Sequence, residues 1–373
     1  MLFHIWRHAH SQAYHNSPQH ICMLCLKFST ERFSLRRAHA IIIKEPENPS
    51  NERKPAMKIT VLDKCTVTTG DVSLSPLEAL GEVRFFDTLP REKLAAAIGD
   101  SELVVCNKAN ITASLMDACP ALRYIGVLAT GVNNIDIEAA NARGIVVCNV
   151  PGYSTSSVVQ HVFALILHFA SRADDYAASV ARGDWTRSET FSYLAYPTYE
   201  LAGKTLGIFG FGTIGRAVSK VAAAFGMNVL AVSHRPTACD GVEFTDTDSL
   251  FARSDYLTFH CPLTEETKGT ANARTLSLMK PSAVLINTAR GGVVEEAALA
   301  AALNENRLRG AGIDVLDTEP MKPDHPYLTA KNCYVTPHVA WASQEARTRL
   351  VKITADNIKA FLSGAPVNQV NHL

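Results

Sequence analysis

Three polar residues in the second half of the chain could together perform acid–base chemistry on a carbonyl group. Arg290, Glu319 and His338 each follow an apolar run that is typical of a buried strand. The arginine is a permanent cation that can hold a carboxylate and polarise a ketone. The imidazolium can give the carbonyl oxygen a proton, and the glutamate can orient the imidazole and favour its charged form. These are the groups that reduction of a 2-keto acid requires.

The elements that must position these groups alternate between strand and helix, which predicts parallel sheets covered on both faces. A first block starts at Met57, and its predicted strands are Ile59–Leu62, Val83–Phe86, Leu103–Cys106, Tyr124–Val127 and Ile145–Asn149. A second block starts at Lys204, and its predicted strands are Thr205–Phe209, Val229–Val232, Tyr256–His260, Val284–Asn287, Gly310–Val315 and Cys333–Val335. The second block fits a six-stranded doubly wound sheet. Long helices are predicted from about Ser156 to Arg172 and from about Ser343 to Leu362.

Composition narrows the class of protein further. The chain has 373 residues, 47% of them hydrophobic, which suggests two domains of ordinary size. Its formal net charge of zero gives no electrostatic reason to expect a nucleic acid or a membrane surface as partner. No apolar run is long enough to span a bilayer. The nine cysteines are an odd number and several lie in apolar runs, so we expect a reducing, cytoplasmic setting.

The first 56 residues differ from the rest, because they hold six of the 13 histidines and end in a polar, proline-rich stretch. We expect residues 1–56 to be a disordered extension, or Met57 to be the true start. Two other interpretations stay open. Cys22-x-x-Cys25 with His20 could bind zinc, although a single such pair is a weak signal. The absence of acidic residues up to position 30 also allows an organelle presequence.

A glycine-rich loop, Gly210-Phe-Gly212-Thr-Ile-Gly215, predicts a dinucleotide site because it follows an apolar strand and opens a helix. Gly210 permits the tight turn, Gly212 lets the backbone approach a pyrophosphate, and Gly215 lets helix and strand pack closely. The phosphates would then lie on the exposed amides of the helix N-terminus. At the end of the next strand, Ser233-His234-Arg235 offers no carboxylate for ribose hydroxyls but suits a 2′-phosphate. We therefore expect NADP(H) to be favoured over NAD(H), with use of NAD(H) or of both as the alternative.

From Met57 to the C-terminus the chain resembles the D-2-hydroxyacid dehydrogenases. The matching stretches, in order, begin at Gly126, Gly210, His260, Ile286, Gly312 and Thr336. Within that family the chain looks most like the glycerate dehydrogenase and hydroxypyruvate reductase branch. The resemblance implies that Arg290 binds the substrate, that His338 is the acid in reduction and the base in oxidation, and that Glu319 pairs with His338.

The same resemblance implies further contacts around these three residues. The expected dinucleotide contacts are Gly210, Gly212, Thr213, Ile214, Gly215, Ser233, His234, Arg235, Cys261, Pro262, Thr267, Thr288, Ala289 and Asp314. The expected substrate contacts are Lys108, Ala129, Thr130, Gly131, Arg290 and Trp341. Glycine's backbone freedom would let the loop at 128–131 turn amides toward a carboxylate. No metal site is expected among these residues.

The family architecture implies a Rossmann cofactor domain, residues 153–337, inserted in a flavodoxin-like substrate domain, residues 57–152 and 338–373. The long helix from Ser156 would form the contact of a homodimer. The leading hypothesis is therefore an enzyme that reduces hydroxypyruvate or glyoxylate to D-glycerate or glycolate. Two alternatives remain: a reductase of another 2-keto acid, and a dinucleotide-sensing regulator on the same fold.

Overall fold

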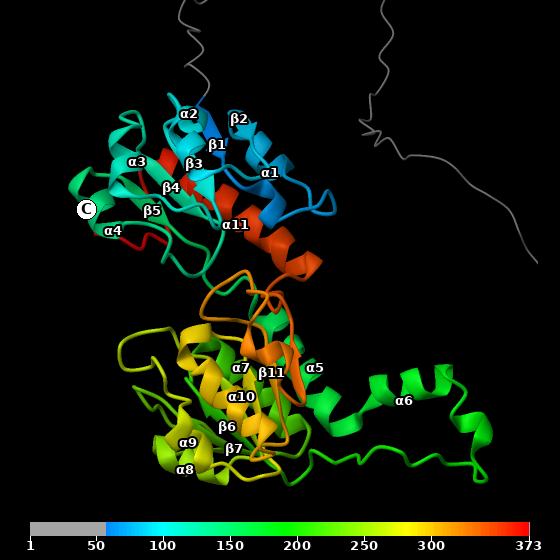
Figure 1. Cartoon of the computed structure of the whole chain (residues 1–373). Helices are drawn as coiled ribbons and strands as arrows, with labels where there is room; N and C mark the ends of the chain where they lie inside the picture. The colour runs from blue at the N-terminus through cyan, green and yellow to red at the C-terminus, as the bar shows by residue number, and fades with distance from the viewer. Residues whose placement is uncertain (1–56, 373) are drawn as a thin grey trace, which may run out of the picture. The chain divides into compact units, whose positions relative to one another are not determined.

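The computed structural model describes residues 57–372 and places the two α/β blocks in two parallel sheets (Figure 1). The predictions made for residues 1–56, including the zinc motif and the presequence, lie outside the described residues. The expected fold class is confirmed.

The first sheet has five parallel strands in the order β2-β1-β3-β4-β5, the order typical of flavodoxin-like folds. The strands are β1 (Lys58–Val61), β2 (Glu82–Phe85), β3 (Leu103–Cys106), β4 (Tyr124–Val127) and β5 (Val146–Cys148). One face is covered by α2 (Leu94–Ile98), α3 (Ala113–Asp117) and α4 (Ile137–Ala142). The other face is covered by α1 (Ser75–Glu78) and by α11 (Gln344–Leu362), the helix that was expected near the C-terminus.

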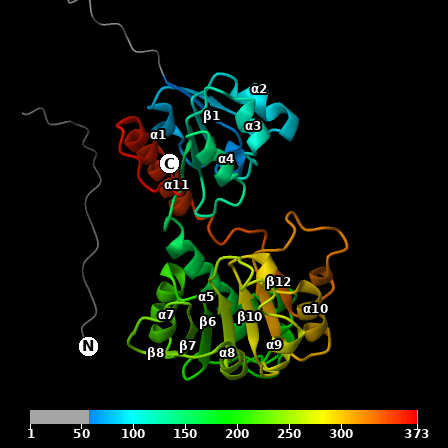
Figure 2. The same cartoon turned by 90° about the vertical axis from the view of Figure 1, so that its left-hand side faces the viewer.

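The second sheet has seven parallel strands in the order β12-β11-β10-β9-β6-β7-β8 (Figure 2). The strands are β6 (Thr205–Phe209), β7 (Asn228–Val232), β8 (Val242–Phe244), β9 (Tyr256–Phe259), β10 (Val284–Asn287), β11 (Gly310–Ile313) and β12 (Cys333–Val335). The prediction of six strands was wrong because it missed β8. That strand is three residues long, lies at the sheet edge and has no fully buried side chain, so it lacks an apolar signal.

Helices cover both faces of the second sheet. On one face lie α5 (Thr155–Ser171) and α7 (Thr213–Ala224), and on the other α8 (Thr247–Arg253), α9 (Ala273–Ser277) and α10 (Glu296–Asn304). The helix α5 ends at Arg172, whose φ of 53° is left-handed, and a further helix α6 (Ala173–Ala181) follows at once. Because helices cover both faces of the sheet, we expect the chemistry at the ends of the strands.

The topology brings the three chemical residues together. The strands β10, β11 and β12 are neighbours in the sheet, and Arg290, Glu319 and His338 follow their carboxyl ends. In an open parallel sheet this edge is where ligands bind. In the first sheet, the neighbouring strands β3 and β4 are followed by Lys108 and by the 128–131 loop.

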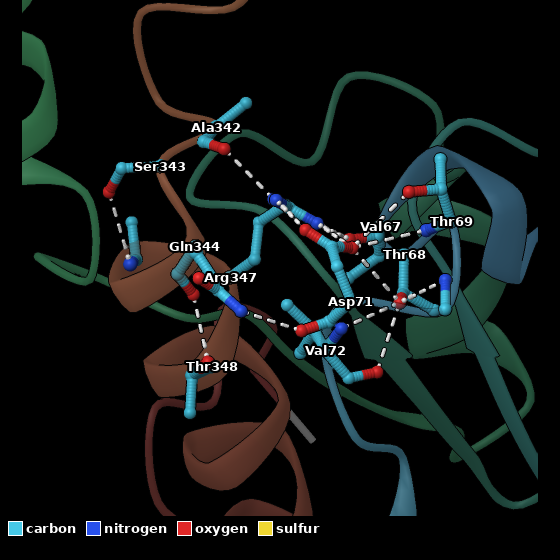
Figure 3. A network of polar contacts seen from close by, with 12 residues as sticks. Val67, Thr68, Thr69, Asp71, Val72, Ala342, Ser343, Gln344, Arg347 and Thr348 are labelled. Atoms are coloured by element: carbon cyan, nitrogen blue, oxygen red, sulfur yellow. Dashed lines mark hydrogen bonds and ion pairs between the residues drawn. The ribbon is translucent and has the colours of Figure 1, made fainter.

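The start of α11 is fastened to the loop that follows β1 by a polar network (Figure 3). Arg347 makes two parallel bonds to Asp71, with Nη1 at 2.8 Å from Oδ1 and Nη2 at 2.6 Å from Oδ2. The same guanidinium donates to the carbonyl oxygens of Val67 and Ala342, and Gln344 Nε2 donates to Asp71 O at 2.8 Å. Because α11 follows directly on the segment that carries His338, this network also limits where that segment can lie.

Replacing Asp71 with asparagine is expected to lower Tm at neutral pH, because the arginine pair is lost. Hydrogen bonding from Arg347 holds the pKa of Asp71 well below its usual range. A depressed carboxyl pKa contributes stability above the ordinary value of about 3.9, and that contribution is lost as pH falls. The Tm difference between parent and variant should therefore persist from pH 7 to about 5 and shrink below pH 4. Asp356→Asn, at an exposed pair with Lys359, is the matched control and should leave Tm unchanged. A Tm difference for Asp71→Asn that grew on acidification would contradict this account.

Candidate active site

The glycine loop joins β6 to α7 with no space for side chains at two of its positions. Gly210 has a φ of 99°, and a Cβ there would lie 2.7 Å from the Cys261 nitrogen. A Cβ on Gly215 would overlap the carbonyl oxygen of Gly210. Only glycine therefore allows this turn and this close approach of helix and strand.

Gly212 differs, because a Cβ there would meet nothing within 4 Å. It is the N-cap of the twelve-residue helix α7 and supplies no side-chain cap. The amides of Thr213 and Ile214 donate to no atom of residues 57–372, so they are available to an anion. The hydroxyl of Thr288, at the end of β10, is buried and also has no partner among these residues. These features fit a dinucleotide whose pyrophosphate lies at the N-terminus of α7. Gly212 leaves space for it, the two amides can donate to it, and the Thr288 hydroxyl lacks a partner within the described residues.

At the end of β7, Ser233 is half-buried while His234 and Arg235 are exposed. The Ser233 hydroxyl accepts a hydrogen bond from the Arg235 amide at 3.3 Å. Within the described part of the chain the Arg235 guanidinium has no carboxylate partner, so its charge is not neutralised. Residues 233–235 therefore present a hydroxyl and a cation at the end of β7.

The end of β9 carries groups that stay neutral. Burial raises the pKa of the Cys261 thiol to about 11, so the thiol keeps its proton. Burial also lowers the pKa of His260 to about 3, and its Nε2 lies 3.1 Å from Thr258 Oγ1. Neither group can replace His338 as an acid near neutral pH. The Thr267 hydroxyl closes the following turn, since it donates to Pro262 O at 2.7 Å.

Arg290 is held in place by the turn that follows β10. The buried Asn287 side chain accepts from the Ala289 amide at 3.0 Å and donates to Arg290 O at 2.9 Å. The Arg290 Nη1 donates to Ala289 O at 2.7 Å. Its Nη2 lies against Gly131 of the first sheet, where a Cβ would come within 2.6 Å of it. The guanidinium is therefore held next to a loop that follows the first sheet.

His338 and Glu319, the expected acid–base residues, lie in direct contact. His338 Nδ1 lies 2.7 Å from Glu319 Oε2, and the second carboxylate oxygen accepts from the Leu316 amide at 3.0 Å. Burial raises the pKa of Glu319, but hydrogen bonds from His338 and Leu316 outweigh it, so the pKa lies below its ordinary value. The positive charge of Lys108 adds to this lowering. Glu319 is therefore ionised at neutral pH and leaves His338 Nε2 free to face a substrate.

Asp314 organises the segment that carries His338. It is 1% exposed, and its carboxylate accepts from Thr336 Oγ1 at 2.6 Å and from the amides of Val339 and Ala340, both at 2.9 Å. Its carbonyl oxygen accepts from the His338 amide at 2.8 Å. His338 has a φ of 56°, a left-handed conformation that needs such support. The dinucleotide contact expected at Asp314 is thus a carboxylate whose oxygens are already bonded inside the protein.

Lys108 and the 128–131 loop, which we expect to contact the substrate, follow strands of the first sheet. Asp63 accepts from the amides of Asn107, Lys108 and Ala109, which fixes the loop and leaves the Lys108 side chain exposed. The Thr130 hydroxyl donates to Val150 O at 2.9 Å.

The other residues expected to contact the substrate offer backbone amides and one indole. The amides of Ala129, Thr130 and Gly131 donate to no atom of the described residues. Trp341 is half-buried and packs edge-on to Tyr153, with ring centroids 6.2 Å apart.

Four polar residues of this site were not predicted from the sequence. Asp63, Asn287, Thr336 and His161 all hold the loops that carry the chemical groups. Asp63 and Asn287 could have been found, because each stands at the carboxyl end of a strand. His161 could not, since it lies on a helix far from the site in sequence.

Among residues 57–372 no group of three or more histidine, cysteine or acidic side chains could hold a metal ion. None of the helices in this range is long and apolar enough to cross a membrane.

A doubly wound sheet with a dinucleotide cradle, next to an acid–base pair and a free guanidinium, defines a nicotinamide-dependent oxidoreductase. Residues 163–340 match the family model described as D-isomer specific 2-hydroxyacid dehydrogenase, NAD binding domain. A hydroxypyruvate reductase from Blautia hydrogenotrophica is 40% identical over 321 residues, 84% of this chain and 100% of that relative. The glycerate dehydrogenase of Methylorubrum extorquens is 43% identical over 281 residues, 75% and 88% of the two chains.

A solved structure gives the same result. The NADPH-dependent glyoxylate/hydroxypyruvate reductase of Sinorhizobium meliloti, in complex with NADP and malonate, has a TM-score of 0.73 and 30% identity. It covers 84% of this chain and 96% of its own. The protein belongs to the D-isomer specific 2-hydroxyacid dehydrogenase family.

Proposed function

We propose that the protein reduces hydroxypyruvate or glyoxylate to D-glycerate or glycolate. The observation that carries the proposal is the His338–Glu319 pair at 2.7 Å, together with Arg290 on the neighbouring strand end. The relatives named as hydroxypyruvate reductase and glycerate dehydrogenase support this choice of substrates.

In the proposed reaction, Arg290 binds the substrate carboxylate and polarises the ketone, while Lys108 and the free amides at 129–131 hold the same carboxylate. His338 gives its Nε2 proton to the carbonyl oxygen, and Glu319 remains ionised beside the imidazolium. A bound nicotinamide supplies the hydride, so the carbonyl gains one hydride and one proton. In the reverse direction His338 accepts the hydroxyl proton. The indole of Trp341 would lie beside the bound substrate.

For the dinucleotide, we propose that Gly210, Gly212, Gly215 and the amides of Thr213 and Ile214 hold the pyrophosphate. Its other contacts would be Ser233, His234, Arg235, Cys261, Pro262, Thr267, Thr288 and Ala289, while Asp314 would support the segment that carries His338. The domain boundaries proposed for these two tasks are 57–152 with 338–373 for the substrate, and 153–337 for the dinucleotide.

A steady-state survey that crosses NADH and NADPH with five 2-keto acids tests the function. Hydroxypyruvate and glyoxylate should be reduced with a higher kcat/KM than pyruvate or two bulkier keto acids. A higher kcat/KM for one of the other acids would move the assignment to that substrate. Absence of turnover with every acid, with dinucleotide-dependent self-association, would replace the enzyme with a dinucleotide sensor.

We expect a preference for NADPH, because Ser233 and Arg235 offer a hydroxyl and a cation to a 2′-phosphate, and residues 233–235 include no carboxylate. Arg235→Ala should raise the Kd of NADPH about tenfold or more, since a charge-assisted hydrogen bond is lost. The Kd of NADH, measured on the same variant, is the internal control and should stay within twofold. A parent enzyme that prefers NADH by more than tenfold would reverse this assignment.

We infer that the protein is a homodimer in which the arm from Ala173 to Tyr199 packs on a second copy. This arm extends away from the second sheet (Figure 1). It exposes large apolar side chains. Phe191 is 91% exposed and Leu194 is 87% exposed. Monomers rarely leave such residues uncovered. Sedimentation should show a dimer for the parent and a monomer for Phe191→Ser/Leu194→Ser; a monomeric parent at micromolar concentration would refute the contact.

We place the enzyme in the cytoplasm. The cysteines of residues 57–372 are all free thiols, as a reducing compartment requires. Fractionation of cells with detection of the chain tests this, and recovery outside the cytoplasm would overturn it.

A further inference from the structure

The segment that carries His338 makes side-chain hydrogen bonds to the helix α5. Two residues one turn apart on α5 contact this segment. Ser157 Oγ donates to Ala340 O at 2.7 Å, and His161 Nε2 lies 3.0 Å from Thr336 Oγ1. These contacts stand on opposite sides of His338 in the chain. The conformation of the segment therefore depends on α5.

The direction of the His161 hydrogen bond follows from the donors available. A threonine hydroxyl has one proton, and Thr336 donates it to Asp314 Oδ1 at 2.6 Å. Toward His161, Thr336 can then only accept. The imidazole must therefore carry a proton on Nε2 and donate it. The result is a chain of directed bonds from His161 through Thr336 to Asp314.

The same imidazole nitrogen lies 3.6 Å from Asp314 Oδ1, and the Asp314 side chain is fully buried. The donors to that carboxylate are the Thr336 hydroxyl and the amides of Val339 and Ala340. A buried carboxylate needs strong donors to stay in place. His161 thus orients the Thr336 hydroxyl, which is one of the donors to the carboxylate that holds the backbone of residues 336–340.

We propose that His161 is a positioning residue for the reaction, which sets the place of His338 through Thr336 and Asp314. This role rests on the proposed function, because it is His338 that meets the substrate. His161 itself contacts no reacting atom. Loss of its Nε2 donor lets the 336–340 backbone relax, and the His338 imidazole then moves relative to the carbonyl oxygen. A displacement of about 1 Å at a proton donor can cost about a hundredfold in rate.

The test compares His161→Leu with His161→Gln, because the glutamine amide can place a donor near the position of Nε2. The leucine variant should lose about tenfold or more in kcat for hydroxypyruvate. Its KM for the keto acid and its Kd for the dinucleotide should stay within about threefold. The glutamine variant should recover most of kcat. His168→Gln, on the same helix but bonded to Asp174, is the matched control and should keep the parent kcat.

A leucine variant with the parent kcat would overturn the proposal, as would a glutamine variant as slow as the leucine one. If His161→Leu does not fold, Thr336→Val against Thr336→Ser repeats the test, since only serine keeps the hydroxyl. A double variant, His161→Leu with Thr336→Val, should be no slower than the slower single variant. Additive losses would count against one shared chain of bonds.

Hydrogen exchange separates this inference from the proposed function. Amides of residues 336–340 should lose protection in His161→Leu and keep it in His161→Gln, whether or not a substrate is known. An inactive parent that shows this pattern would contradict the function and leave the positioning role standing. Unchanged protection in both variants, in an active parent, would contradict the positioning role alone.

Discussion

Replacement of His338 by asparagine is expected to lower kcat for keto-acid reduction by about 10²–10⁴-fold, the usual contribution of a general acid. Asparagine suits the test because it tolerates the left-handed backbone that position 338 adopts, with a φ of 56°. The backbone of the segment should stay as it is while the proton donor is lost. His338→Ala, which lacks that tolerance, should show a similar loss together with a lower Tm.

The dinucleotide affinity of the asparagine variant should remain within about twofold, because no contact joins His338 to the glycine loop in residues 57–372. Stopped-flow measurement of the hydride-transfer step and fluorescence titration of the dinucleotide give the two quantities separately. A variant that binds the dinucleotide normally and reduces hydroxypyruvate at the parent rate would remove His338 from the mechanism.

The pH dependence follows from the state of Glu319. The pKa of Glu319 lies below its ordinary value of about 4.3. Glu319 is therefore ionised above about pH 4.3, and it is protonated only as the pH falls below that value. Glu319 should therefore cause no loss of reductase activity between pH 7 and about 5. Reduction needs a proton on His338 and oxidation needs its absence, so the two directions should respond to pH in opposite senses.

The sequence predicted those parts of the site that depend on local pattern. Short local patterns of glycine and apolar residues predict three of these parts. They are the glycine loop, the strands that precede Arg290 and His338, and the helix α11. The parallel topology then placed the strand ends at one edge without further information. The short strand β8 was missed because its half-exposed side chains carry no such pattern.

Contacts between distant segments could not be predicted in this way. Asn371 bonds to the backbone of Val147 and Ile145, more than two hundred positions earlier in the chain. Similarly, the approach of Gly131 to Arg290 joins two sheets. Such pairs depend on tertiary packing, so a single sequence gives them no signal. The positioning of His338 by His161 belongs to the same class.

Arg290→Gln is expected to lower kcat/KM for hydroxypyruvate by about 10²–10³-fold, because one preorganised electrostatic donor to the reacting carbonyl and the carboxylate is removed. Arg290→Lys should recover only part of this loss. A lysine keeps the charge but cannot present two parallel donors to a carboxylate. It would also lose the bond from Nη1 to Ala289 O, which holds the guanidinium in place.

Gly131→Ala tests the same interaction from the other sheet without changing any charge. The added Cβ would lie 2.6 Å from Arg290 Nη2, so the guanidinium has to move. This variant should lose activity in the same sense as Arg290→Lys, and combining the two should cost less than the product of the single effects. Gly212→Ala is a matched alanine substitution, since its Cβ meets nothing within 4 Å, and it should affect dinucleotide Kd instead.

The substrate itself provides the most selective readout of Arg290. Glyoxylate and glycolaldehyde both offer an aldehyde, but only glyoxylate carries a carboxylate for the guanidinium. The parent should have a much higher kcat/KM for glyoxylate than for glycolaldehyde. Arg290→Gln should lower kcat/KM for glyoxylate far more than kcat/KM for glycolaldehyde. If the variant instead lost activity equally on both substrates, Arg290 would act on the carbonyl alone, and Lys108 with the amides of the 129–131 loop would be left to bind the carboxylate.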